Sequence, residues 1–145
     1  MDHAATAAEF FARWSTSFDE MCVAFTEVFA PTCVWDQRPI PRATGPEQAV
    51  RFLRMSRRSI GLDTIDVEML SIAVAGYTVH TQRVDHLKRA DGSLIASAPV
   101  AGVLTFQEDG LLAHWREYFD AATLASRSTV SGVGALARKI GSFRR

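Results

Sequence analysis

The sequence predicts an α+β domain in which a curved antiparallel β-sheet wraps around a few helices. The part before Asp63 is dominated by apolar residues at helical spacing, whereas the part from Asp63 onward reads as consecutive strands. Two of the turns between these strands contain Asp-Gly, a strong hairpin signal. The expected element order is ααβαββββ. A sheet wrapped around amphipathic helices leaves an apolar pocket where its concave face is incompletely filled.

The expected helices all precede Asp63. The first covers 4–14 and presents aromatic side chains, and the second begins after Ser17, which has capping-box spacing with Glu20. The third covers 47–60, with Thr44 and Glu47 as a second capping box and Gly61 at its end. We therefore expect three helices with apolar faces turned toward the sheet.

The expected strands divide between one early segment and a later meander. Residues 31–41 alternate β-forming residues and end with prolines, which predicts a short edge strand followed by an extended exit. Four longer segments follow, over 63–74, 77–89, 93–108 and 111–120. Because short turns join them, we expect them to pair in order as antiparallel neighbours.

Length and charge limit the organisation and the classes of partner. The chain has 145 residues and is 48% hydrophobic, which suits one domain over 1–125. Residues 126–145 form a basic tail, for which a short amphipathic helix and a solvated tail both remain open. Basic and acidic residues balance at 16 each, so we expect no binding to nucleic acid or to membranes.

Cysteine and histidine usage indicates a reducing compartment and no metal site. Cys22 and Cys33 have no paired spacing, which favours a cytoplasmic protein over a disulfide-linked secreted one. His80 and His86 have the opposite strand parity from the charged pair described next, and no metal-binding motif is present. We expect neither a metal nor another cofactor.

The candidate site begins with Arg83 and Asp85, which lie two residues apart in a predicted strand and so share one face of the sheet. From spacing alone, a structural ion pair is the commoner explanation. Asp120 closes the last predicted strand and would approach this pair if the sheet curls. Two carboxylates beside one guanidinium can divide the duties of base and acid.

Several segments together resemble the limonene-1,2-epoxide hydrolase family. They are "RVDHL", "WREYFD" and "VWDQRPIP" followed by "GPEQAV", and the similarity runs from about Phe10 to about Asp120. The resemblance implies a cone-shaped fold, a homodimer and a cofactor-independent addition of water to a hydrophobic epoxide. It also implies that Asp120 is the base, Asp85 the acid and Arg83 the bridging arginine.

The resemblance places the water-holding residues at Trp35 and Gln37, where the family has a tyrosine and an asparagine. Gln37 keeps an amide, whereas Trp35 offers only an indole N–H donor. The alternative is that Trp35 packs in the core, as most tryptophans do. This departure keeps one alternative function open, and the fact that a fold does not fix a function keeps a second. One is an epoxide-opening cyclase or isomerase with the same acid–base pair, and the other is a non-catalytic dimeric binding domain for small molecules.

Overall fold

The helices and strands that position the site are taken from a computed structural model that describes residues 1–120. Residues 126–145, with the tail discussed above, lie outside the described residues. In chain order the elements are α1 (His3–Ala12), the 3₁₀ turn η1 (Arg13–Ser15), α2 (Phe18–Val28), β1 (Phe29–Gln37), β2 (Ile40–Thr44), α3 (Gly45–Ile60), β3 (Thr64–Ala75), β4 (Thr78–Lys88), β5 (Leu94–Phe106) and β6 (Leu112–Phe119).

The strands form one six-stranded sheet with the order β2-β1-β6-β5-β4-β3. The predicted meander is confirmed, because β3, β4, β5 and β6 pair antiparallel in sequence order. The prediction of an edge strand at residues 31–41 is wrong. The proline-rich exit forms β2, which pairs antiparallel with β1, while the other side of β1 pairs parallel with β6.

The helix ends follow local capping chemistry. The Ser17 side chain accepts a hydrogen bond from the backbone N–H of Glu20 at the start of α2, as predicted. The expected capping box at Thr44 is wrong, because its hydroxyl makes no capping bond and its N–H donates instead to the Gln48 side chain at 2.8 Å. Gly61 ends α3 in the left-handed conformation at φ 75°.

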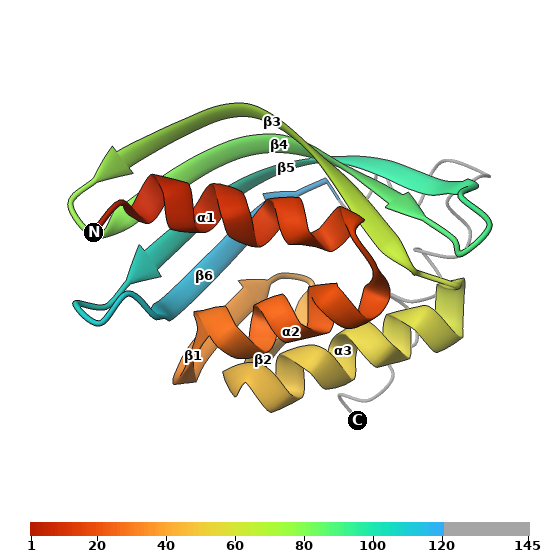
Figure 1. Ribbon diagram of the computed structural model, residues 1–145, viewed down its shortest axis with the longest axis horizontal. Coiled ribbons are helices and arrows are strands. Elements are labelled where there is room, and N and C mark those ends of the chain that lie inside the picture. Colours follow the sequence, from red (N-terminus) through yellow and green to blue (C-terminus); the bar gives the residue numbers. More distant parts are fainter. Residues whose placement is uncertain (121–145) are drawn as a thin grey trace.

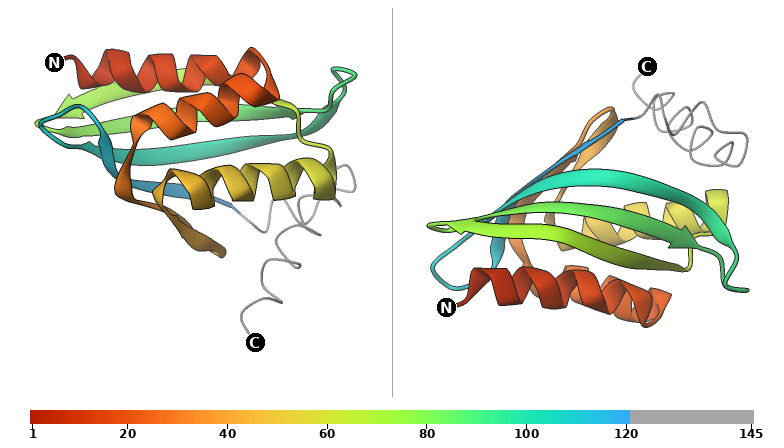
Figure 2. Two further views of the ribbon diagram at one scale, coloured as in Figure 1. Left: turned by 60° about the horizontal axis from the view of Figure 1, so that its bottom comes forward. Right: turned by 90° about the horizontal axis from the view of Figure 1, so that it is seen from above.

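The sheet arches over the helices, which cover its concave face (Figures 1 and 2). Buried aromatic rings from α1, η1, α2, β1 and β6 fill much of the space between these layers: Phe10, Phe11, Trp14, Phe25, Phe29, Trp35 and Trp115. This architecture confirms the α+β cone predicted from the sequence. Across the described residues, no helix is both long enough and apolar enough to span a membrane.

Candidate active site

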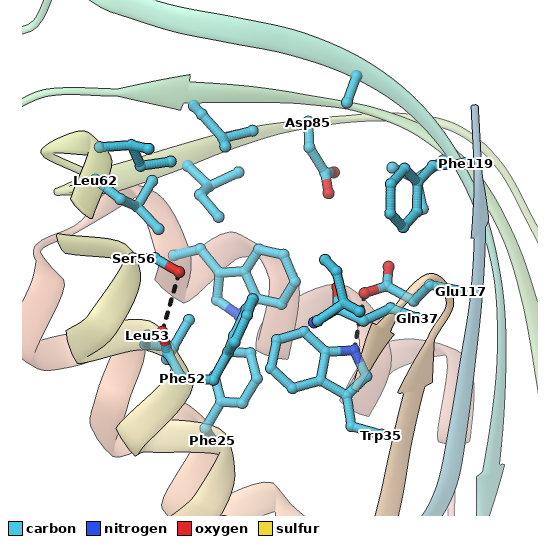
Figure 3. A pocket seen from close by; sticks show the side chains of 17 residues that line it. Phe25, Trp35, Gln37, Phe52, Leu53, Ser56, Leu62, Asp85, Glu117 and Phe119 are labelled. Atoms are coloured by element: carbon cyan, nitrogen blue, oxygen red, sulfur yellow. Dashed lines mark hydrogen bonds between the residues drawn. The ribbon is translucent and has the colours of Figure 1, made fainter. Parts of the chain in front are cut away.

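A cavity of about 130 Å³ lies between the concave face of the sheet and the helices (Figure 3). Its walls are mostly apolar and come from Trp14, Phe25, Trp35, Ile40, Phe52, Leu53, Ile60, Leu62, Ile65, Leu87, Ala98, Val100 and Phe119. The polar side chains on its lining are those of Gln37, Ser56, Asp85 and Glu117. The site therefore combines an apolar wall with a few convergent polar groups, which is typical of a small-molecule pocket.

Arg83 lies at the centre of the charged groups, with its side chain fully buried. Its Nε donates to Asp85 Oδ1 at 2.8 Å and its Nη2 to Asp85 Oδ2 at 3.2 Å, which makes a two-point ion pair along β4. Nη2 also donates to Glu117 Oε2 on β6. One guanidinium thus holds two carboxylates from different strands.

Aromatic rings and charge together keep Arg83 in its ionised form. Its guanidinium carbon lies 4.5 Å from the centre of the Phe11 ring and 5.8 Å from that of Trp115. Burial opposes the charge, but the carboxylates of Glu117 and Asp85 outweigh it and raise the pKa of Arg83. The side chain therefore acts as a fixed cation.

Glu117 is the second carboxylate of the cluster, and its side chain is only 6% exposed. Besides Arg83 it has a neutral partner, because the indole Nε1 of Trp35 donates to Glu117 Oε1 at 2.9 Å. Burial raises the pKa of Glu117, while the charge of Arg83 works in the opposite direction and the negative charge of Asp85 adds to the increase. Glu117 thus holds a proton more strongly than an exposed glutamate.

Three of the five residues predicted for the site line this cavity, and a fourth, Arg83, is bonded to one of them. Arg83 and Asp85 form the predicted pair. The side chains of Trp35 and Gln37 on β1 both face the cavity. Figure 3 shows the carboxylates of Asp85 and Glu117 directed toward the cavity, with Trp35 bonded to Glu117. The residues that the strand pattern and the resemblance selected on β1 and β4 are therefore close together.

Asp120, the fifth predicted residue, is not on the lining of this cavity. It follows the end of β6, is exposed, and lines a separate open groove whose lining also includes Leu70, Gln82 and part of Arg83. The physical reason is strand alternation: Asp120 is an odd number of residues from Glu117, so the two side chains leave opposite faces. The carboxylate bonded to Arg83 from β6 is that of Glu117, in the role expected for Asp120.

Sequence reasoning missed Glu117, although the sequence contained a signal for it. Trp115, Glu117 and Phe119 alternate with Arg116 and Tyr118, so the glutamate shares a face with two large aromatic residues. A carboxylate on the apolar face of a strand needs a partner and marks a candidate site. The alternation pointed to Glu117 more directly than the strand-end position pointed to Asp120.

Trp35 has two roles rather than one. Its ring stacks on that of Trp115 with centres 4.9 Å apart and planes 5° from parallel, so it is a core residue. Its N–H also fixes one oxygen of Glu117. The neighbouring Gln37 is buried, and within residues 1–120 no hydrogen bond involves its side chain. The Gln37 amide is therefore available to a molecule in the cavity.

The other candidate groups do not contribute to this cavity. Burial raises the pKa of Cys33 to about 12, so its thiol is not activated as a nucleophile. His86 bonds Ser97 and Glu68 on the outer face, as its strand parity predicts. In the described part of the chain, no three His, Cys, Asp or Glu side chains are grouped so that they could hold a metal ion.

Comparison with solved structures places the chain among cone-shaped folds. An LEH-like epoxide hydrolase from M. tuberculosis is 21% identical, with 94% of this chain and 96% of that chain covered and a TM-score of 0.69. A structure named as a SnoaL-like polyketide cyclase, from Shewanella denitrificans OS-217, is 15% identical, with coverage of 85% and 93% and a TM-score of 0.70. At these identities the likeness shows the fold.

A further solved structure is named as an isomerase of the SnoaL-like family, from Agrobacterium tumefaciens str. C58. It is 14% identical, with 83% of this chain and 99% of that chain covered and a TM-score of 0.62. A search of the curated proteins found no match. The model of the limonene-1,2-epoxide hydrolase catalytic domain, in contrast, matches residues 12–129, which include the whole charged cluster. The chain belongs to the limonene-1,2-epoxide hydrolase family.

Proposed function

We propose that the protein is a cofactor-independent epoxide hydrolase that adds water to a hydrophobic epoxide and releases a vicinal diol. The observation that supports this most is the pair of buried carboxylates, Asp85 and Glu117, held by one guanidinium at the wall of an apolar cavity. Opening an epoxide needs a base for the attacking water and an acid for the departing oxygen. The cluster offers one carboxyl group for each task.

The charge balance of the cluster favours a single shared proton. Arg83 contributes one positive charge, so two ionised carboxylates would leave an uncompensated negative charge in a buried site. One proton on the pair removes this excess. In the reactive form the shared proton lies on one carboxyl group, which acts as the acid, and the other carboxyl group is ionised and acts as the base.

We assign the base to Glu117 and the acid to Asp85. Asp36 on β1 pairs in parallel with Arg116 on β6. The next residues on the two strands, Gln37 and Glu117, are therefore neighbours. The Gln37 amide and the Glu117 carboxylate can hold one water between them. Arg83 and Trp35 stabilise the ionised glutamate, while burial raises its pKa and strengthens it as a base.

In the proposed step, Glu117 removes a proton from the water as its oxygen bonds to an epoxide carbon. The bond between that carbon and the epoxide oxygen breaks, and Asp85 gives its proton to the oxygen. The diol leaves with Glu117 protonated and Asp85 ionised, and one proton returned from Glu117 to Asp85 through water restores the starting state. The apolar walls exclude other water, which strengthens these charge interactions.

The test is to incubate the protein with a panel of hydrophobic epoxides and to measure diol formation. A single turnover in oxygen-18 water should then place the label in the first diol formed, because the water attacks directly. The Glu117→Gln variant serves as the matched control, since it keeps the side-chain shape and removes the base. Binding without diol formation, or a first diol that lacks the label, would contradict the proposal.

A second candidate is an epoxide-opening cyclase, in which a hydroxyl of the substrate replaces the water. The observation in its favour is that Trp35 donates directly to Glu117, where the resemblance led us to expect a water-holding residue. With an epoxide that also carries a hydroxyl group, a cyclase yields a cyclic ether and a hydrolase yields a triol. Identification of the product decides between the two.

A further inference from the structure

We propose that Gly102 is a positioning residue whose missing side chain reserves the space in which the Arg83 guanidinium meets Glu117. This inference rests on the proposed function, because the groups that it positions are the proposed acid–base pair. Gly102 itself makes no contact with the reacting atoms in the mechanism above. It contributes by leaving room for the position of Arg83, the residue that holds both carboxylates.

Gly102 lies on β5, between the two strands that supply the charged groups. It pairs with Thr81 on β4 and with Glu117 on β6. The residues two positions before and after it, Val100 and Leu104, are both buried, so position 102 faces the concave side of the sheet. A side chain here would enter the cone beside Nη1 of Arg83, the guanidinium nitrogen next to the one that bonds Glu117.

Space, and not backbone conformation, explains the glycine. Glycine inside a strand is unfavourable in itself, and it often marks a place where another group approaches closely. The φ angle of Gly102 is not positive, so an alanine would meet no conformational barrier. A Cβ atom here would, however, lie 2.8 Å from Thr81 Oγ1, 3.0 Å from Arg83 Nη1 and 3.4 Å from Trp115 Nε1.

The surroundings of Arg83 leave it little room to avoid such an atom. The Phe11 ring lies 4.5 Å from the guanidinium carbon, and the Asp85 carboxylate binds Nε and Nη2. An added methyl group must therefore tilt the guanidinium. Because Glu117 contacts the same planar group through Nη2, a tilt weakens the ion pair between Arg83 and Glu117.

This displacement has a measurable signature at Glu117. The charge of Arg83 lowers the pKa that burial raises, so a weaker ion pair lets the pKa of Glu117 rise further. Simple loss of packing would lower stability without a specific change in that titration. The proton affinity of Glu117 is therefore the readout that separates a positioning role from a purely structural one.

The experiment is a carbon-13 NMR titration of the Glu117 carboxyl group in the wild type and in Gly102→Ala, with Glu117→Gln to identify the signal. We expect the pKa of Glu117 to move upward in Gly102→Ala. The low-pH limb of kcat/KM should move upward with it, and kcat should fall roughly tenfold to a hundredfold while KM changes little. Ala101→Ser is the matched control, because it also adds one atom to β5 at an exposed position.

A double-mutant cycle shows whether the effect passes through Arg83. In an Arg83→Lys background, which lacks Nη1, Gly102→Ala should leave the Glu117 titration unchanged. If Gly102→Ala does not fold, Thr81→Ala combined with Gly102→Ala removes the shortest contact and is compared with Thr81→Ala alone. An unchanged titration in the folded glycine variant, or the same shift in both backgrounds, would overturn the proposal.

The titration needs no substrate, so it separates this inference from the proposed function. A wild-type protein that forms no diol would overturn the hydrolase proposal, and the NMR titration would still decide whether Gly102 positions Arg83. If the protein forms diol but the pKa of Glu117 is the same with and without Gly102→Ala, the hydrolase proposal stands and the positioning proposal fails. The two proposals therefore fail in different measurements.

Discussion

Charged side chains gather on both faces of the sheet, and the two clusters differ chiefly in their exposure. On the concave face, Arg83 holds Asp85 and Glu117 with side-chain exposures of 0%, 10% and 6%. On the outer face of the same region, His86 bonds Glu68 at 3.1 Å and Lys88 pairs with Asp66. The Glu68 side chain is 58% exposed. Similar groups thus occur in water on one face and in an apolar interior on the other.

The comparison separates charged groups that cost little free energy to keep from those that are costly to bury. Exposed ion pairs usually contribute about 0–1 kcal/mol, because water solvates their members whether they are paired or not. A buried cluster is stable only while its charges balance, and the loss of one partner leaves an uncompensated charge. Two carboxyl groups kept beside a single guanidinium inside an apolar interior are thus better explained by chemistry than by stability.

The largest effect is expected when the cation is removed from the concave cluster. Arg83→Met leaves Asp85 and Glu117 facing each other, so we expect the free energy of unfolding to fall by about 3–5 kcal/mol and turnover to be lost. Urea unfolding measures the first and diol formation the second. Lys88→Met on the outer face is the control, and equal losses from both variants would refute the contrast between the faces.

The second effect is on turnover, and it separates Glu117 from Asp120. Glu117→Gln should lower kcat by about 10²–10⁴-fold, as expected for the loss of a general base. Asp120→Asn should leave kcat near that of the wild type, because Asp120 is not on the lining of the cavity. Steady-state kinetics with one epoxide measures both. The reverse order of effects would restore Asp120 as the base.

A third effect is the pH dependence of stability. Burial raises the pKa of Glu117 in the folded protein, so the folded state keeps a proton that the unfolded chain releases as pH rises. The wild type should therefore lose stability relative to Glu117→Gln from the ordinary glutamate range up to the raised pKa. Urea unfolding at a series of pH values measures the difference, and parallel curves would contradict the assignment.

The smallest effect is expected on the outer face. Glu68→Gln removes the partner of His86 at an exposed position, so the free energy of unfolding should change by no more than about 1 kcal/mol. The value of kcat should stay unchanged, because this pair lies outside the cavity. A combined urea and kinetic measurement checks both expectations, and a loss of turnover would show that the two faces are coupled.

Local patterns predicted much of the fold. The Asp-Gly turns specified the meander, and the two-residue spacing of Arg83 and Asp85 placed them on one face. The prolines at 39 and 41 concealed β2, because proline disfavours a central strand but is accepted at the edge that β2 occupies. The parallel pairing of β1 with β6 joins segments far apart in sequence, and no local signal specifies it.

The site was predicted only in part for a similar reason. Asp120 was selected because it ends the last predicted strand. The alternation of side chains along that strand instead places Glu117 on the same face as large aromatic residues. The two roles of Trp35 could not be separated from sequence, because its hydrogen bond reaches across to a different strand. The space at Gly102 depends on the path of the Arg83 side chain through the core, which spacing does not reveal.

The stacked indoles of Trp35 and Trp115 give this protein a built-in optical reporter. The two rings are stacked with their centres 4.9 Å apart, which is close enough for their electronic transitions to couple. Trp35 is hydrogen-bonded to Glu117, so protonation of that carboxylate alters the indole at one end of the pair. The ionisation state of the proposed base can therefore be followed by light, without substrate and without a label.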